Sequence, residues 1–345
     1  MSKRPTIKDI AQVLNISTST VSRALTDHWD VNPETRKAVL DVAEQLNYNP
    51  NPRSLSLRNG QSHIIGVVMP EFVNSYFAEI LIGMQRVLFA KGYSILIAQS
   101  NESAEIEEKN LKLFERNMVD GIMISMAKDS SNTAYYEHLI KKEVPVVFFN
   151  RVPEDMSIPK VIVDDRTWAF KATEHLIQQG CRRIAHFAGS DNLSVSRERK
   201  LGYISALKKY GLKVDESLII ETGVLMEAGQ NAAMKLLKME QLPDGLFAVT
   251  DPVAIGAMKG LMKNGVRIPQ DIAVIGFTES PYATIIEPNL SSVRQPTFDI
   301  GSTSARLLLN QLSEIKPASQ TIILDASLII RESSLCKEYR KPVKD

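Results

Sequence analysis

Hydroxyl side chains and one arginine lie close together near the start of the chain. The stretch 16–25 reads ISTSTVSRAL, and its polar members are Ser17, Thr18, Ser19, Thr20, Ser22 and Arg23. Short hydroxyls near a helix start can bond phosphate oxygens and base edges in the major groove of DNA, and an arginine fork can bind a phosphate or a guanine edge. A solvated helix whose serines serve only as caps has the same pattern, so both interpretations stay open at this point.

Two short helices joined by a tight turn would position these side chains. Thr6 is a candidate cap of the first helix, with Asp9 at the third position of a capping box, and Asn15 ends that helix. Ser17 can cap the second helix, and a third is expected to begin at Asn32, where a proline follows in the first turn. Apolar residues recur at helical spacing in all three segments. We therefore predict a small three-helix bundle that contains a helix-turn-helix.

Composition bounds the class of protein. The 345 residues exceed the usual size of one domain, and 44% apolar with 23% charged residues is ordinary for a globular protein. We find no apolar run of membrane-spanning length, no secretory signal, and only Cys181 and Cys336, which are too isolated for a disulfide framework or a thiolate metal site. The net charge is +1, with the basic excess concentrated in the first 26 residues. We expect a cytoplasmic protein with no membrane partner, no cofactor and no metal.

The remainder of the chain alternates between strand-like and helix-like segments. Residues 49–62 are polar and proline-containing and are predicted to be a linker. Four short β-rich runs follow (IIGVVMP, SILIAQS, GIMISM, PVVFFN), and four more repeat the pattern (RIAHFAG, LIIETG, GLFAVTD, DIAVIGF). Strands of this kind, separated by helical stretches, are typical of doubly wound parallel sheets. We therefore predict two α/β units in tandem with a cleft between them.

Several motifs together resemble the lac repressor and GalR family of bacterial transcription regulators. TIKDIAQVLNISTSTVSRAL and VNPETRKAVLDVAEQLNYNPN are similar to its headpiece, and RERKLGY, TDPVAIGAMKGL, VRIPQDIAVIGF and PNLSSVRQP are similar to its core. The resemblance implies an α/β protein with an N-terminal three-helix helix-turn-helix headpiece (1–48), a hinge segment (49–62) and a two-lobed, doubly wound core like that of periplasmic binding proteins (63–345). It also implies a homodimer that binds double-stranded operator DNA and takes a small-molecule effector, such as a sugar or sugar derivative, between its lobes.

The resemblance also assigns roles in DNA binding by position. Thr18 and Ser19 correspond to the residues that choose among operator sequences, Arg23 to a base-contacting arginine, and Tyr48 to a tyrosine that braces the third helix at the DNA. A plain core aromatic is the alternative for Tyr48. Thr20 and Ser22 match phosphate-contacting hydroxyls. The complete expected set is Thr6, Ser17, Thr18, Ser19, Thr20, Ser22, Arg23, Tyr48, Asn51, Ser54 and Leu57.

In relatives the linker folds into a hinge helix on DNA, and a leucine wedges into the minor groove. That leucine corresponds to Leu57, and such a wedge would unstack a base step and bend the duplex. Ser54 stands where relatives commonly have alanine, and Pro52 is an uncommon helix opener, so the wedge is better supported than the hinge helix. A plain linker leucine is the alternative.

Effector-binding candidates follow the ends of the predicted strands, where open α/β sheets form their crevices. The expected set is Tyr76, Phe77, Ser125, Asn150, Asp165, Arg199, Asp251 and Thr278. Tyr76 and Phe77 match family positions that line the ligand site, and Arg199 matches an arginine that binds the effector. Other roles remain open: Arg199 could form a salt bridge between lobes, the two aromatic residues could pack the lobes together, and Asp251 could cap the helix that follows it. Asn150 and Asp165 could merely satisfy loop backbone.

Two departures from the family pattern concern the ligand. Thr278 and Glu279 stand where sugar-binding relatives often carry aspartate, and TGVLMEAG lacks their aromatic platform. A sugar stacked on such a ring is therefore less well supported.

Three classes of function compete. We predict a ligand-controlled, sequence-specific transcription regulator that represses carbohydrate or related catabolic genes. Within this class the alternative is a regulator whose corepressor is a phosphorylated carrier protein, for which Arg306 would be a contact unless it is simply a solvated arginine. A free solute-binding protein fits poorly because of the headpiece. Catalysis is disfavoured, because neighbouring Asp164 and Asp165 would point to opposite faces of a strand and no phosphate-binding glycine loop is present.

Overall fold

The computed structural model describes residues 5–26, 28–48, 60–313 and 319–336. The chain divides into two compact units, Met1–His63 and Ile64–Asp345. The hinge candidates Asn51, Ser54 and Leu57 lie outside the described residues.

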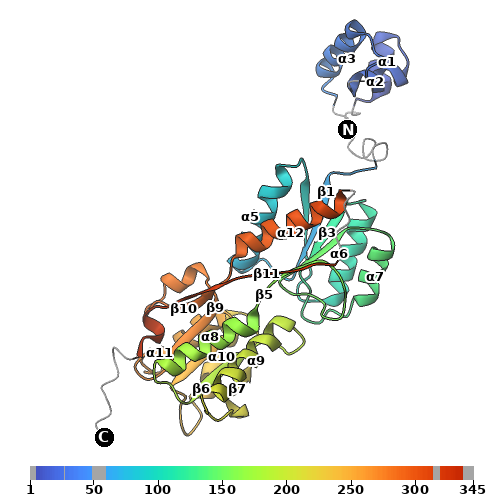
Figure 1. Ribbon diagram of the computed structural model, residues 1–345. Coiled ribbons are helices and arrows are strands. Elements are labelled where there is room, and N and C mark those ends of the chain that lie inside the picture. The colour runs from blue at the N-terminus through green and yellow to red at the C-terminus, as the bar shows by residue number, and fades with distance from the viewer. Residues whose placement is uncertain (1–4, 27, 49–59, 314–318, 337–345) are drawn as a thin grey trace. The chain divides into compact units, whose positions relative to one another are not determined.

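The first unit is a bundle of three helices, α1 (Ile7–Leu14), α2 (Thr18–Leu25) and α3 (Pro33–Gln45) (Figure 1). Its core is formed by the apolar residues that recur at helical spacing, among them the fully buried Ile10, Val21 and Val39. Asn15 ends α1 in the left-handed conformation, with a φ of 51°. This geometry turns the chain directly into α2. The predicted three-helix bundle is therefore confirmed.

The second unit contains two six-stranded sheets, one in each lobe. The first sheet has the order β11-β5-β4-β3-β1-β2. Its strands are β1 (Ile64–Met69), β2 (Ser94–Gln99), β3 (Gly121–Ile124), β4 (Val146–Phe149), β5 (Lys160–Val163) and β11 (Thr321–Leu324). The second has the order β12-β10-β9-β8-β6-β7. Its strands are β6 (Ile184–Ala188), β7 (Ile219–Glu221), β8 (Gly245–Ala248), β9 (Ala273–Thr278), β10 (Ser291–Arg294) and β12 (Ser327–Ile329).

Both sheets are parallel throughout, apart from the antiparallel pair of β10 and β12. Helices link the strands of both sheets. They are α5 (Ser75–Phe89), α6 (Ala104–Arg116), α7 (Thr133–Lys141), α8 (Asp165–Gln178), α9 (Ser194–Lys209), α10 (Met226–Leu236), α11 (Asp251–Lys263) and α12 (Thr297–Leu312), with the short helices η1 (Glu216–Leu218), η2 (Pro281–Thr284) and η3 (Glu332–Ser334). The doubly wound α/β class is confirmed.

The two lobes are interleaved along the chain, so the prediction of two units in tandem is wrong. The chain passes between the lobes after β5, after β10 and again after β11, because α12 and β11 return to the first lobe. There β11 pairs with β5, and α12 packs on α5 (Figure 1). Gly83 permits this close packing, since an added Cβ would collide with the carbonyl oxygen of Phe298. The returning strand covers an edge of the first sheet that would otherwise be unpaired.

The sequence predicts helical stretches near 76–91, 105–117, 132–143, 196–210, 227–240 and 252–264, so α8 and α12 were not predicted. Within the described part of the chain, no helix is long and apolar enough to cross a membrane.

Candidate functional site

The polar side chains of the helix-turn-helix gather at the start of α2. The hydroxyl of Ser17 caps this helix by accepting a hydrogen bond from the backbone N–H of Thr20 at 3.1 Å. The same hydroxyl shares hydrogen bonds with the hydroxyls of Ser19 at 2.7 Å and Thr20 at 2.8 Å. Thr18 and Ser19 are exposed, while Thr20 and Ser22 are half-buried. Ser17 therefore caps the helix, while the hydroxyls of Thr18 and Ser19 remain exposed at its start.

Arg23 projects from the last turn of α2, and 58% of its side chain is exposed. Its Nη1 donates to Oδ2 of Asp30 at 2.9 Å. We did not predict a role for Asp30, which lies in the loop before α3. A guanidinium with this exposure can reach a partner molecule with its other donors.

Thr6 and Tyr48 have structural partners within the first unit. The backbone N–H of Thr6 donates to Oδ2 of Asp9 at 2.6 Å, as expected for the predicted capping box, and the hydroxyl of Thr6 donates to the same oxygen at 2.7 Å. Tyr48 is half-buried and packs against the headpiece core, and burial raises the pKa of its phenol. The core-aromatic interpretation therefore describes what Tyr48 does in the isolated unit.

A cavity lies between the two lobes of the second unit. Its volume is about 810 Å³ including its open mouth, and its lining comes from both lobes and from the crossing segment after β10. Five predicted residues line it: Tyr76, Phe77, Asn150, Arg199 and Thr278. Ser125, Asp165 and Asp251 do not line this cavity.

Arg199 is buried and bound on several sides. Its Nε and Nη2 lie 2.8 and 2.7 Å from Oδ1 of Asp165, its Nη1 donates to the carbonyl of Val249 at 2.7 Å, and its guanidinium lies 3.8 Å from the ring centre of Phe277. Because Asp165 begins α8 and Arg199 belongs to α9, the ion pair joins two helices of the second lobe and does not bridge the lobes. Each Nη carries two N–H groups, so one on each remains for a ligand.

Asp165 thus orients the arginine, and it has no place on the cavity wall. Burial raises the pKa of its carboxyl, and the Arg199 guanidinium opposes that rise. Asp164 caps α8 by accepting from the N–H of Thr167 at 2.9 Å. The two aspartates therefore lie at a helix start, so our argument from alternation along a strand does not apply to them.

Ser125 and Asp251 lie deeper than we expected. Ser125 is fully buried, and its hydroxyl has no hydrogen-bond partner among the described residues. Asp251 is also fully buried, and its carboxylate accepts from the hydroxyl of Ser292 and the N–H of Ser280, both at 2.6 Å. Burial raises the pKa of Asp251 to about 7. The cap of α11 is Thr250, so Asp251 does not have the capping role we considered.

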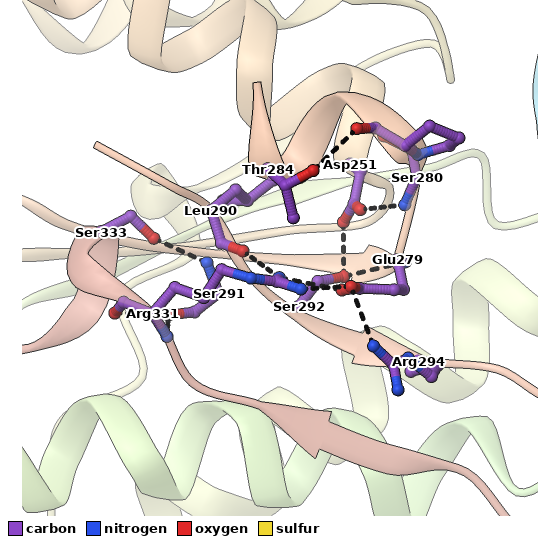
Figure 2. A network of polar contacts seen from close by, with 11 residues as sticks. Asp251, Glu279, Ser280, Thr284, Leu290, Ser291, Ser292, Arg294, Arg331 and Ser333 are labelled. Atoms are coloured by element: carbon purple, nitrogen blue, oxygen red, sulfur yellow. Dashed lines mark hydrogen bonds and ion pairs between the residues drawn. The ribbon is translucent and has the colours of Figure 1, made fainter. Parts of the chain in front are cut away.

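Figure 2 shows the contacts of Asp251 and of the neighbouring Glu279 and Ser280. Thr278, which directly precedes Glu279, lines the cavity. The backbone φ values of Thr278 and Glu279 are 120° and 58°, a region that side chains disfavour. The carboxylate of Glu279 forms a two-point ion pair with Arg331, whose Nη1 lies 3.0 Å from Oε2, and Arg294 lies 3.4 Å from it. Glu279 itself lines the cavity, and these contacts hold its strained loop in place.

Gln295 is a cavity residue that we did not predict. The hydroxyl of Tyr76 lies 3.0 Å from Oδ1 of Asn150 and 2.9 Å from Oε1 of Gln295, yet it has one proton to donate. The Gln295 side chain is 4% exposed, and its Nε2 has no hydrogen-bond partner among the described residues. Its position directly after a strand is the same signal that identified Asn150, and we missed it because we did not predict β10.

Metal ligation and contacts with a carrier protein gain little support from the side chains of the protein. The described residues contain no group of three or more His, Cys, Asp or Glu side chains that could hold a metal ion. Arg306 is exposed on α12, and its Nη1 donates to the hydroxyl of Ser302 at 3.3 Å. This contact is that of an ordinary helix-surface arginine.

Two family models match the chain. The model described as "Bacterial regulatory proteins, lacI family" matches residues 6–51. The model described as "Periplasmic binding proteins and sugar binding domain of LacI family" matches residues 62–332. These ranges contain the helix-turn-helix and the two lobes respectively.

Individual relatives match over nearly the full length. The probable HTH-type transcriptional repressor ExuR of Bacillus subtilis is 32% identical over 332 residues, which cover 95% of this chain and 98% of the relative. Catabolite control protein A of Priestia megaterium is 32% identical over 330 residues, covering 95% and 99%. A solved complex of the transcriptional regulator CelR with cellobiose has a TM-score of 0.73 at 29% identity, covering 96% of this chain and 100% of that one.

Proposed function

Since the chain belongs to the LacI family of bacterial regulatory proteins, we propose that it is a repressor whose affinity for operator DNA is controlled by an effector bound in the interlobe cavity. The repressor works as a homodimer on double-stranded DNA, in the cytoplasm, where the bacterial genome lies. The headpiece is residues 1–48, the hinge segment 49–62 and the core 63–345. The family matches to 6–51 and 62–332 support this division.

Operator recognition falls to the exposed side of α2. Thr18 and Ser19 are exposed at the helix start, where side chains of this size enter the major groove, and Arg23 extends from the last turn. Thr20 and Ser22 contribute phosphate contacts, and Leu57 acts as the minor-groove wedge, which stays a prediction because it lies outside the described residues.

The observation that carries effector control is the cavity between the two lobes, which are joined by three crossing segments of the chain. Lining residues come from both lobes, so a ligand bound there contacts both and favours one arrangement of them over another. Gln295 lies on one of the crossing segments, with a buried amide nitrogen that lacks a partner among the described residues. An effector that accepts a hydrogen bond from this amide would satisfy a group that is costly to leave unpaired.

The charges that line the cavity disfavour an anionic effector, because Glu71 and Glu79 accept hydrogen bonds from neutral groups and the other charged groups are paired. Arg199 is paired with Asp165, Arg151 with Glu102 at 2.7 Å, and Glu279 with Arg331. A carboxylate or phosphate would have to compete with these existing partners. Hydroxyls can use the remaining donors of Arg199 and the amides of Asn150 and Gln295, which suits a sugar.

The experiment begins with DNA, because it does not require the effector. Purified full-length chain is used to select fragments from the genomic DNA of the source bacterium, and the affinity of the enriched sequence is compared with that of random DNA. We expect a preference of at least about 10³-fold, the low end for specific DNA-binding proteins. A chain that binds both DNAs equally would contradict the proposal.

The second step tests control. A panel of neutral mono- and disaccharides, each with its carboxylated or phosphorylated counterpart, is added to the complex with the selected DNA. We expect a neutral member to change operator affinity, and operator DNA to change the affinity of that sugar by the same factor, because the coupling is reciprocal. A response only to charged members would contradict our assignment of the effector class.

The remaining candidates gain no support. A free solute-binding protein would have no use for the headpiece, and the membership of a family of regulators argues against an enzyme. Arg306 has no feature that favours a phosphorylated carrier protein, so that alternative stays a prediction.

A further inference from the structure

The loop between α2 and α3 places a carboxylate beside the arginine expected to contact DNA. Asp30 accepts a hydrogen bond from Nη1 of Arg23 on Oδ2 at 2.9 Å, and Nδ1 of His28 lies 2.7 Å from its Oδ1. The Asp30 side chain is 28% exposed, whereas that of Arg23 is 58% exposed. The carboxylate is therefore partly enclosed, and the arginine bound to it still reaches outward.

Both ends of this loop are anchored to the bundle. The N–H of His28 donates to the carbonyl of Arg23 at 3.1 Å, and the N–H of Val31 donates to the carbonyl of His28 at 3.3 Å. Val31 packs against the headpiece core, and Asn32 caps α3 by accepting from the N–H of Glu34 at 2.8 Å. Asp30 is thus held in place by its neighbours, and the ion pair draws Arg23 toward that place.

The geometry of the pair determines which donors remain for DNA. Asp30 contacts Nη1, so Nε and Nη2 form the open edge of the guanidinium. These two nitrogens present parallel N–H groups, which match the O6 and N7 acceptors of guanine in the major groove. A flexible arginine would have to find this orientation at binding and would lose side-chain freedom there.

We propose that Asp30 is a positioning residue that holds Arg23 with its Nε–Nη2 edge ready to bind guanine, and that it sets base specificity at one operator position. This inference rests on the DNA role proposed for Arg23. The negative charge of Asp30 also opposes the phosphates in every DNA sequence, so this repulsion lowers the affinity for all DNA alike and leaves the discrimination to the guanine contact.

The test uses the full-length chain and DNA that the chain itself selects from random sequences. Affinity is measured for the preferred sequence and for variants with a single base pair exchanged, with Arg23→Ala, Asp30→Asn and the double variant. We expect Arg23→Ala to lose discrimination at one guanine position by roughly 5- to 150-fold, the worth of a bidentate contact. Asp30→Asn should lose part of this discrimination, up to roughly fivefold, at the same position and none elsewhere, because an exposed ion pair is worth at most about 1 kcal/mol.

Two further results follow from a positioning role. The double variant should discriminate no worse than Arg23→Ala alone, because Asp30 acts through Arg23. Asp30→Glu, which keeps the charge on a longer side chain, should restore part of the discrimination. Thermal unfolding should be nearly unchanged, since exposed ion pairs contribute little to stability.

Asp41→Asn is the matched control. Asp41 is exposed on α3, so this variant removes the same charge from the same unit without touching Arg23. Both aspartate variants should bind unrelated DNA more tightly, but only Asp30→Asn should lose discrimination. If Asp30→Asn discriminates as wild type while Arg23→Ala does not, the positioning role is wrong. If Arg23→Ala also discriminates as wild type, the DNA contact proposed for Arg23 fails first.

Discussion

The proposed DNA surface and the interlobe cavity are built in opposite ways. The DNA-facing residues lie within one short stretch, and Thr18, Ser19 and Arg23 are exposed. The cavity residues come from segments more than 200 positions apart, such as Tyr76 and Gln295, and they are buried or half-buried among prearranged partners. A surface that must fit a long, charged duplex keeps its donors open, while a cavity for a small ligand pairs most of its polar groups and leaves a few donors, such as Nε2 of Gln295, for the ligand.

This difference predicts different costs of substitution. A cavity residue supports the fold as well as the ligand, so its loss should affect both. A residue of the DNA surface supports little besides binding.

The largest expected effect is that of Arg199→Ala. It leaves the buried Asp165 without its cationic partner, and breaking a buried ion pair from one side typically destabilises by about 3–5 kcal/mol. Chemical denaturation should show this loss, and the response of operator binding to the effector should disappear. Operator affinity without effector should persist while the variant is folded, because the headpiece is a separate unit. A variant with full stability and full effector response would show that Arg199 neither stabilises the fold nor binds the effector.

A pH titration tests the second buried carboxylate. Burial raises the pKa of Asp251 in the folded chain from 3.8 to about 7, so the folded state binds its proton more tightly than the unfolded state does. The resulting stability is present below pH 4 and is lost as the pH rises toward 7, by about 4 kcal/mol. Asp251→Asn should lack this loss. The difference between the two proteins is the quantity to measure, because it cancels His175 and His186, whose pKa values burial lowers to about 4. A pH-independent difference would contradict the raised pKa.

Substitutions on the DNA surface should have smaller effects, and these should be confined to DNA affinity. We expect Arg23→Ala to lose about 1–3 kcal/mol of affinity for the selected operator, with unchanged stability. Lys37→Ala removes the same charge from the same unit and serves as the control, because any loss it causes should be similar for all DNA sequences. If Arg23→Ala lost the same affinity for the selected operator and for unrelated DNA, Arg23 would contact only a phosphate.

The smallest effect is spectroscopic. The chain has two tryptophans, and Trp29 is 90% exposed beside Asp30 in the loop of the first unit, whereas Trp168 is buried in the core. In a Trp168→Phe variant the fluorescence therefore reports on this loop alone. We expect operator DNA to change the emission of Trp29. An unchanged spectrum would show that this loop does not contact the DNA.

The headpiece could be predicted closely, and the cavity only in part. Helix periodicity and the caps at Thr6 and Ser17 depend on residues a few positions apart, so they can be recognised in the sequence. The rule that ligands bind beyond strand ends led to Asn150, but it also led to Ser125 and Asp251, which are fully buried. Whether a residue at a strand end faces a cavity depends on what packs over it, and no local pattern contains that information.

The sequence by itself determined the helix-turn-helix, the α/β class and the positions of most strands, because each depends on short-range propensity and on the burial pattern of adjacent residues. The family was recognised separately, from the resemblance of several motifs. Only the tertiary structure decided that α12 and β11 return to the first lobe and that Gln295 lies in the cavity. It alone also decided that Glu279 pairs with Arg331 and Arg23 with Asp30. The physical reason is that charged and polar groups choose partners by distance in space, and a buried group must find one wherever the fold supplies it.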